Sequence, residues 1–302
     1  MKFSRADLAN LGYFLAIAKN RSFRLAGLEM GVSTSALSHS LRGLEDRVGV
    51  RLVNRTNRSV ALTAAGQELY TAIAEPFAKI DGALDVLNHY RKTPAGSIRL
   101  NVFDQAATLL LAPVMPTFLD RYPEVDIDLV ITNNLVDITE QGFDAGIRYG
   151  GTVPEDMIAQ RLSAEICWVA AASPAYLERF GTPRKPNDLL KHRCLQIRLG
   201  DDRVYRWEFD RKGGTLEIAV PGAITLNDIE TARAMALSGA GILYGPEPSL
   251  AADIQSGALR RVLKDWSSVG PGMFIYYSSR RQVPVPIRLL VELIQEIQPL
   301  GM

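Results

Sequence analysis

The stretch SFRLAGLEMGVSTSALSHSLRGLE, residues 22–45, decides the fold of the first part of the chain. It predicts two short amphipathic helices joined by a tight turn at Met30-Gly31-Val32. Ser33 is placed to cap the second helix, because a serine hydroxyl there accepts from an unpaired backbone N–H. Gly49 is placed to end that helix in a left-handed conformation. Apolar residues at helical spacing then predict one buried stripe, made of Leu37, Leu41, Leu44 and Val48.

The opposite face of this second helix has short hydrogen-bonding side chains and one long cation. These residues are Thr34, Ser35, Ser38, His39 and Arg42. On an isolated helix, such a face is usually just solvated. It is also the layout of a DNA recognition helix, which enters a major groove about 12 Å wide and pairs with base edges. The flanking sequence favours this second interpretation.

The flanks supply the rest of a DNA-binding unit. Upstream, a helical stripe is made of Leu8, Leu11, Leu15 and Ala18, and Ser22 can cap the helix in which Phe23, Ala26 and Met30 are expected to face inward. Gly27 indicates a close helix–helix approach, because glycine in a helix costs about 1 kcal/mol relative to alanine.

A β-hairpin is predicted downstream, where VRLVNRTNRSVALT (50–63) alternates and turns at Thr56-Asn57-Arg58. Arg51, Arg55 and Arg58 on this wing can reach phosphates or a narrow minor groove. Three helices followed by such a wing predict a winged helix-turn-helix.

The charge distribution agrees with this prediction. Residues 1–62 hold ten Lys and Arg against four Asp and Glu, a net charge of +6, whereas the whole chain is +1. The remaining residues therefore carry −5. A basic head fits a polyanion, and an acidic body argues against a chain that coats nucleic acid along its length.

Length and composition indicate about two domains with sizeable cores, since the chain has 302 residues of which 47% are hydrophobic. Asp7 and Asn10 interrupt the early apolar stretch, so no signal peptide is expected. No apolar run approaches the roughly 20 residues that span a bilayer. We expect a cytoplasmic protein without membrane contact, in which Cys167 and Cys194 are buried thiols rather than a redox switch.

Residues 64–92 predict one long helix. Its apolar residues step by 4, 3, 4 and 3, a heptad seam made of Ile73, Phe77, Ile80, Leu84 and Leu87. Such a seam on a helix between two domains favours dimerisation over a surface helix of a monomer. Pro76 is expected to kink the helix or remove one hydrogen bond. Thr93-Pro94-Ala95-Gly96 is expected to end it and make a hinge.

The pattern after Gly96 is α/β. Strands are expected at 97–103, 125–131, 144–149, 167–171 and 242–244, and helices at 106–121, 136–141 and 228–238. A hairpin pairs 207–209 with 217–220 around Gly213-Gly214. Near Pro271 the chain is expected to return to the first unit, as a strand at 273–278 and a helix at 287–297. Strands that alternate with helices imply mostly parallel sheets in two lobes.

Together these motifs resemble the LysR-type transcriptional regulators. The matching residues are Ser22-Phe23, Gly31-Val32-Ser33, Ser35-Ala36-Leu37-Ser38, Leu44-Glu45, Gly49-Val50-Arg51-Leu52, Asn54-Arg55-Thr56, Arg58 and Leu62-Thr63-Ala64-Ala65-Gly66. Residues 143–148, 205–209 and 279–284 resemble the effector-binding half of the same family. Three residues depart from the family pattern. Gly27 and Val53 change packing, and His39 stands where Arg is common and weakens the charge of the exposed face.

The resemblance implies the fold class and the domain boundaries. These are an all-α winged helix-turn-helix domain (1–63), a long linker and dimerisation helix (64–92), and an α/β effector-binding domain (95–302) like a type 2 periplasmic-binding protein. Lobe I would be 95–166 with 271–302, and lobe II 167–270. The implied partners are double-stranded operator DNA, a small-molecule effector, and further copies of the chain, as a dimer or a dimer of dimers.

In such a fold, ligands lie between the lobes, at strand C-termini and helix N-termini. The candidate residues are Phe103, Asp104, Gln105, Thr132, Asn133, Arg148 and Tyr149 in lobe I, and Gln196, Arg198, Asn227 and Asp228 in lobe II. Arg148 or Arg198 can clamp a carboxylate, and Asp104 can accept from an amine or hydroxyl. We therefore expect an effector with both acceptor and donor groups.

Structural alternatives stay open for several of these residues. Asp104 is also placed to cap its helix, Asn227 or Asp228 is placed to cap the next one, and Arg148 can simply pair with a carboxylate such as Asp144. Trp207 is more often a core residue than a ligand wall.

Catalytic and cofactor motifs are not apparent. His39, His89 and His192 fall in three separate elements, which argues against a triad or a metal cluster. Gly239-Ala240-Gly241 has a helix before it and a strand after it, the reverse of a phosphate-binding loop, and is better explained as a helix C-terminal turn. The sequence thus predicts a ligand-responsive transcription factor without a cofactor. Its rivals are a solute-binding or enzymatic α/β protein, and a DNA binder without sequence preference.

Overall fold

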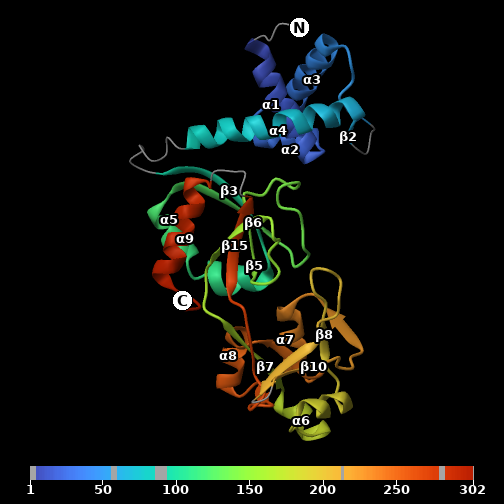
Figure 1. The fold of residues 1–302 in the computed structure, drawn as a ribbon, viewed down its shortest axis with the longest axis vertical. Coiled ribbons are helices and arrows are strands. Elements are labelled where there is room, and N and C mark those ends of the chain that lie inside the picture. Colours follow the sequence, from blue (N-terminus) through green and yellow to red (C-terminus); the bar gives the residue numbers. More distant parts are fainter. Residues whose placement is uncertain (1–4, 56–59, 86–93, 212–213, 279–282, 302) are drawn as a thin grey trace. The chain divides into compact units, whose positions relative to one another are not determined.

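In the computed structural model, the described residues are 5–55, 60–85, 94–211, 214–278 and 283–301. The chain divides into two compact units, Met1–Leu87 and Asn88–Met302 (Figure 1).

The first unit is a helical bundle with a short hairpin. Its elements are α1 (Arg5–Asn20), α2 (Phe23–Met30), α3 (Thr34–Val48), β1 (Val53–Arg55), β2 (Val60–Leu62) and α4 (Ala64–Asp85). The predicted caps are confirmed: Ser22 and Ser33 accept from backbone N–H groups of α2 and α3, and Gly49 ends α3 with φ 77°. The buried stripe of α3 packs on Phe14 and Ile17 of α1 and forms the core of this unit.

Two details of this unit differ from the prediction. The Met30 side chain is 38% exposed rather than inward-facing. Gly27 is buried as expected, but a Cβ at Gly27 would lie 2.7 Å from the Val32 carbonyl oxygen. The close approach is therefore to the turn that follows α2, which explains why glycine is needed there.

The linker helix α4 contains Pro76, as predicted. Ile73 packs against the core of this unit, and Ile80 is 49% exposed. Phe77 is half-buried. The side chain of Leu84, the residue Leu87 and the expected continuation of the helix from 86 to 92 lie outside what the structure describes.

The sheet of lobe I, in the second unit, has the strand order β4-β3-β5-β15-β6. The strands are β3 (Ala95–Val102), β4 (Glu124–Ile131), β5 (Ala145–Tyr149), β6 (Met157–Arg161) and β15 (Met273–Ser278). Strand β3 runs parallel to β4 and β5, whereas β15 runs antiparallel to β5 and β6. The predicted return of the chain near Pro271 is confirmed, because β15 lies in this first sheet (Figure 1).

The helices of lobe I are a π-helical turn (η2, Ala106–Leu111), α5 (Met115–Arg121) and α9 (Val285–Ile297), and α9 packs one apolar face into the lobe core. The single helix expected at 106–121 is broken at 112–114. Proline has no backbone N–H and therefore cannot donate the hydrogen bond that continues a helix. Pro116 lies in the first turn of α5, where the backbone N–H groups need no partner within the helix. The helix expected at 136–141 is only a turn, in which Asp137 accepts from the backbone N–H groups of Thr139 and Glu140.

Lobe II is built around β7 (Ile166–Ala172). Its other strands are β8 (Leu195–Ile197), β9 (Trp207–Arg211), β10 (Gly214–Ile218), β11 (Ile224–Leu226), β12 (Leu243–Pro246), β13 (Arg260–Val262) and β14 (Ser268–Gly270). Its helices are α6 (Pro174–Phe180), the 3-10 helix η3 (Pro186–Lys191), α7 (Ile229–Leu237) and α8 (Glu247–Ser256). The expectation of mostly parallel sheets is wrong here, because β12, β13 and β14 all pair antiparallel to β7.

Candidate functional sites

The exposed face of α3 is the candidate DNA-binding surface. Thr34, Ser35, His39 and Arg42 are exposed, and Ser38 is half-buried. Thr34, His39 and Arg42 have no hydrogen-bond or ion-pair partner within the described part of the chain. Three groups that can donate or accept are thus held on a rigid helix and left available to an external partner.

The two predicted serines at the helix starts have structural contacts of their own. The Ser33 hydroxyl accepts from the Ala36 N–H at 3.2 Å and lies 2.9 Å from the Ser35 hydroxyl. The Ser22 hydroxyl accepts from the Leu25 N–H at 3.3 Å. Both therefore begin helices in this unit. The Arg55 side chain and Arg58 lie outside the described residues, and Arg51 is exposed.

The hairpin is fixed to α3 by Glu45, which the sequence reasoning quoted only as part of a motif. Its carboxylate accepts from the backbone N–H groups of Leu52 and Val53, at 2.8 and 3.1 Å. Thr63 donates its hydroxyl to the Arg51 carbonyl and accepts from the Gly66 N–H. These bonds hold the start of the hairpin and the start of α4 against α3.

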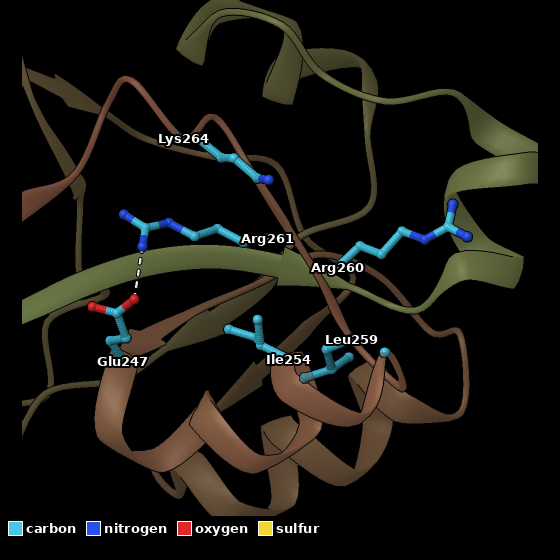
Figure 2. A pocket seen from close by; sticks show the side chains of 7 residues that line it. Glu247, Ile254, Leu259, Arg260, Arg261 and Lys264 are labelled. Atoms are coloured by element: carbon cyan, nitrogen blue, oxygen red, sulfur yellow. Dashed lines mark hydrogen bonds and ion pairs between the residues drawn. The ribbon is translucent and has the colours of Figure 1, made fainter.

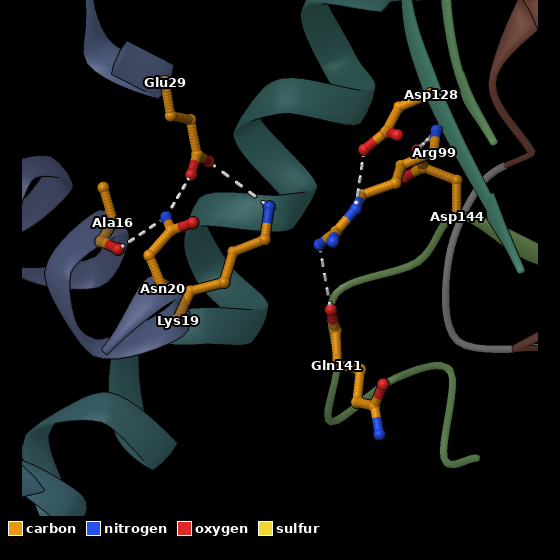
Figure 3. A network of polar contacts seen from close by, with 8 residues as sticks. All are labelled: Ala16, Lys19, Asn20, Glu29, Arg99, Asp128, Gln141 and Asp144. Carbon is orange, nitrogen blue, oxygen red and sulfur yellow. Dashed lines mark hydrogen bonds and ion pairs between the residues drawn. The ribbon is translucent and has the colours of Figure 1, made fainter. Parts of the chain in front are cut away.

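A second polar network joins α1 to α2 (left part of Figure 3). Asn20 donates to the Ala16 carbonyl at 2.9 Å and to the Glu29 carboxylate at 2.5 Å, and the Lys19 ammonium lies 3.3 Å from Glu29. Near the other end of α1, Arg47 of α3 is paired with Asp7. The α1–α2–α3 geometry is thus fixed by polar contacts as well as by the core.

The second candidate site lies in the second unit, where β3 ends in lobe I. The Asp104 N–H donates to the Asn133 side chain at 3.1 Å, and Gln105 accepts from the Tyr149 hydroxyl at 2.5 Å. The Phe103 ring packs against the Tyr149 ring at a tilt of 51°, with ring centroids 4.6 Å apart. The structure therefore brings together the residues that the sequence placed at the ends of β3, β4 and β5.

Lobe I touches lobe II directly at this place. The Asn133 amide donates to the Asn227 carbonyl at 2.5 Å, and the Ile229 N–H of α7 donates to the Asp104 carboxyl at 3.3 Å. Asp228 caps α7 by accepting from the Thr231 N–H at 2.6 Å, so its capping role is confirmed. Polar side chains from both lobes converge on the first turn of α7.

The charges at this contact are perturbed. Burial raises the pKa of the Asp104 carboxyl, although the hydrogen bonds that it accepts from the Gln105 and Ile229 N–H groups act to lower that pKa. The hydrogen bond from Thr231 lowers the pKa of Asp228. Burial also raises the pKa of the Tyr149 hydroxyl. The two pKa values therefore shift in opposite directions, because burial dominates at Asp104 and hydrogen bonding to Thr231 dominates at Asp228.

Arg148 is 4% exposed and surrounded by carbonyl groups. Its Nη atoms donate to the carbonyls of Ile147, Thr132 and Asn134, at 2.8, 3.1 and 3.1 Å, and also to the Asn101 side chain. Its Nε and the Asn101 and Gln105 amide nitrogens are buried without a partner among the described residues. Arg148 thus fixes the 132–134 segment, which carries the interlobe residue Asn133.

The lobe II residues Gln196 and Arg198 are engaged within their own lobe. Gln196 donates to the Val220 carbonyl at 2.7 Å and accepts from the Thr225 hydroxyl at 2.8 Å. Arg198 is exposed and donates to the Asp202 carbonyl at 2.8 Å. Trp207 is fully buried in the core of lobe II, as its structural interpretation expected.

Trp168 and Tyr205, which the sequence reasoning missed, extend the aromatic side of the interlobe region. Trp168 lies 5.7 Å from Tyr149 of lobe I and 5.9 Å from Tyr205 of lobe II, measured between ring centroids. Trp168 follows directly on the strand residue at which the chain enters lobe II, and this position was the available signal. The lobes therefore share an aromatic contact beside their polar one.

A separate hollow of about 530 Å³ lies in lobe II between α8 and β13 (Figure 2). Arg260, Arg261 and Lys264 line it, over Ile254 and Leu259, and Arg261 pairs with Glu247 at 2.7 Å. None of the predicted effector residues lines this hollow.

The described part of the chain shows neither a group of metal-ligating side chains nor a membrane-spanning helix. There, no three His, Cys, Asp or Glu side chains are grouped to hold a metal ion. No helix in those ranges is long and apolar enough to span a bilayer. Burial raises the pKa of the Cys194 thiol to about 12, and Cys167 is also a free thiol.

These features define a protein in which a winged helix-turn-helix precedes a two-lobed α/β domain. Residues 8–67 match the model of the bacterial regulatory helix-turn-helix proteins of the LysR family, and residues 91–298 match the LysR substrate binding domain. The chain belongs to the family of LysR-type transcriptional regulators, which are not enzymes.

Individual similar proteins support the same family assignment. The chain is 39% identical over 291 residues to the uncharacterized HTH-type transcriptional regulator YcaN of Escherichia coli, covering 96% of this chain and 95% of that protein. The solved structure of CrgA, a LysR-type regulator from Neisseria meningitidis, aligns with a TM-score of 0.60 at 26% identity, over 98% of this chain and 99% of that one. Full-length AphB of Vibrio cholerae aligns with a TM-score of 0.63 at 23% identity, over 99% and 100%, and supports the fold alone.

Proposed function

We propose that this regulator binds specific DNA sequences through α3 and that a small-molecule effector bound between the two lobes modulates this binding. The observation that carries the DNA half is the α3 surface. Its apolar stripe is buried, its opposite face presents the Thr34, His39 and Arg42 side chains without partners among the described residues, and residues 1–62 carry a net charge of +6.

The roles within that surface follow from side-chain chemistry. Thr34, Ser35, Ser38 and His39 have short donors and acceptors suited to base edges, and Arg42 suits a phosphate. Ser22 and Ser33 support this face by beginning α2 and α3. Arg55 and Arg58 remain proposed phosphate or minor-groove contacts of the wing.

The effector half rests on the convergence of polar groups from both lobes at the first turn of α7. Because Arg148 and Arg198 already bind carbonyl groups, we assign polar recognition to Asp104, Gln105, Asn133, Asn227 and Asp228, with Phe103 and Tyr149 as the apolar wall. An effector with donor and acceptor groups fits this set best.

A dimer, or a dimer of dimers, would bring two α3 helices to adjacent major grooves, about one helical turn apart. The exposed Ile80 on α4 supports this arrangement as part of an apolar seam. As a regulator of transcription, the protein would work in the cytoplasm, where bacterial DNA lies.

The experiment that tests this function is binding of the full chain to its upstream intergenic DNA and to random DNA over a series of salt concentrations. We expect tighter binding to the intergenic DNA at each salt concentration. Arg42→Ala should weaken both kinds of binding and lower the salt slope by about 1, because one phosphate contact is lost. Ser38→Ala should instead alter preference at particular base positions. Equal affinity for both DNAs would contradict specific regulation.

A further inference from the structure

Glycines inside the helices of the first unit differ in what surrounds them. A Cβ on Gly27 of α2 would lie 2.7 Å from the Val32 carbonyl oxygen, and a Cβ on Gly66 of α4 would overlap the Leu52 carbonyl. Both contacts are with backbone atoms, which cannot move aside as the end of a side chain can. The fold of this unit therefore requires both residues to lack a side chain.

Gly43 of α3 has no such contact. It lies in the interior of the helix and is exposed, and a Cβ there would have no atom of the described residues within 4 Å. Glycine is one of the least favourable residues in a helix interior, whereas alanine is the most favourable. Packing within the chain therefore gives no reason for a residue without a side chain at this position.

The position of Gly43 on α3 points to an external partner. Ser35, His39 and Gly43 follow one another at i, i+4 and i+8 and are all exposed, whereas Leu37 and Leu41 on the opposite face are buried. At 1.5 Å per residue, this row is about 12 Å long. That length matches the width of a DNA major groove, which is also about 12 Å.

The charged neighbours of Gly43 indicate where a DNA contact would end. Arg42 is exposed, has no partner among the described residues, and suits a phosphate. Asp46 is also exposed, follows within one helical turn, and would be repelled by phosphates. The phosphate wall of the groove is therefore expected between Arg42 and Asp46, where Gly43 lies.

We propose that Gly43 is a positioning residue for DNA recognition, because its missing side chain lets the wall of the major groove contact the backbone of α3. This inference rests on the proposed function, since it requires α3 to enter a major groove. A methyl group at position 43 would hold the helix away from the wall. The bonds from Ser35 and His39 to base edges would then lengthen, and a hydrogen bond is lost once its atoms are about 3.6 Å apart.

Titration of the full chain with its upstream intergenic DNA and with random-sequence DNA, over a series of salt concentrations, tests this role. In Gly43→Ala, we expect the affinity for the intergenic DNA to fall at least about tenfold, as when one base contact is lost. The affinity for random DNA should fall less, because that binding depends mainly on phosphate charge. The salt slope should stay that of wild type, since no charge is changed. Gly43→Leu, which is larger and equally uncharged, should lose more affinity than Gly43→Ala.

Gly12→Ala is the matched control. Gly12 lies inside α1, where a Cβ would be in ordinary contact with the Phe77 ring of α4 at 3.7 Å. Both alanine variants should unfold at the wild-type temperature or above it, because alanine favours a helix and has room at each position. Only Gly43→Ala should weaken DNA binding.

The possible results separate this role from the proposed function. Wild-type affinity of Gly43→Ala for the intergenic DNA would overturn the role of Gly43 and leave specific binding through α3 standing. A loss of affinity together with a lower unfolding temperature would also overturn it, because the effect would then belong to the fold. If the wild-type chain does not prefer the intergenic DNA, the proposed function fails and the role of Gly43 fails with it.

Discussion

At the scale of single residues, the two arginines predicted as carboxylate clamps have opposite surroundings. Arg148 is buried and its Nη groups donate to four backbone carbonyls, whereas Arg198 is exposed beside Asp202. Burial lowers the pKa of Arg148, and no carboxylate is among its hydrogen-bond partners in the described residues. The sequence identified both residues as cations near the lobe boundary, but only the fold distinguishes a positioning residue from a surface one.

These surroundings predict a difference in stability. Arg148→Ala leaves several buried carbonyls without donors and should lower the free energy of unfolding of the second unit by about 3 kcal/mol or more. Arg198→Ala, the matched control, should change it by less than about 0.5 kcal/mol. Denaturant titration followed by circular dichroism measures both. Similar losses in the two variants would contradict the structural role of Arg148.

At the scale of elements, the start of α4 shows why a motif glycine is needed. A Cβ on Gly66 would lie 2.0 Å from the Leu52 carbonyl oxygen, whereas a Cβ on Gly43 of α3 would have no atom within 4 Å. The Leu52 carbonyl accepts from the Thr63 N–H at 3.0 Å and is held in place. Helix α4 and the segment that leads into β1 can approach this closely only if residue 66 has no side chain.

The corresponding prediction compares two Gly→Ala changes in helices of the same unit. Gly66→Ala should destabilise the first unit by about 1–3 kcal/mol through overpacking. Gly43→Ala should be neutral or stabilising by up to about 1 kcal/mol, since alanine is the better helix former and has room. Thermal unfolding provides the measurement. Equal effects at the two positions would show that the close approach at Gly66 does not matter.

Element boundaries were predictable where a local signal ends the element. Ser33 and Gly49 bound α3 as expected, and the Asp228 cap begins α7. The helix expected at 136–141 failed, because Asp137 satisfies the backbone N–H groups of the turn directly. The antiparallel pairing around β7 also escaped prediction, since strand direction depends on long-range connections that hydrophobic periodicity does not encode.

At the scale of the whole molecule, assembly depends on apolar surface that one chain does not cover. Ile80 lies at the predicted seam of α4 and is 49% exposed. In a dimer through this helix, that side chain would be buried. Two DNA-binding units would then bind one operator together.

Ile80→Glu should therefore shift the protein toward monomers and weaken operator binding by at least about tenfold, because two charges would be buried in an apolar seam. Sedimentation velocity and DNA titration check this result. Leu190→Glu provides the control, since Leu190 of η3 is 55% exposed and lies outside the seam. A dimer that persists in Ile80→Glu would show that the chain assembles through other surfaces.

The sequence by itself determined the winged helix-turn-helix, the polar face of α3 and the return of the chain to lobe I. These depend on periodicity, caps and charge, which are local properties of the chain. Only the tertiary structure decided which of the predicted effector residues contact the other lobe and which bind within their own lobe. It showed Arg148 enclosed by carbonyls, Gln196 bound within lobe II, and Asp104 accepting from the Ile229 N–H of the other lobe. These contacts join residues more than 100 positions apart in some cases, as Asp104 and Ile229 show, with a sequence separation of 125. No local pattern specifies which distant partner a polar group meets when it is buried.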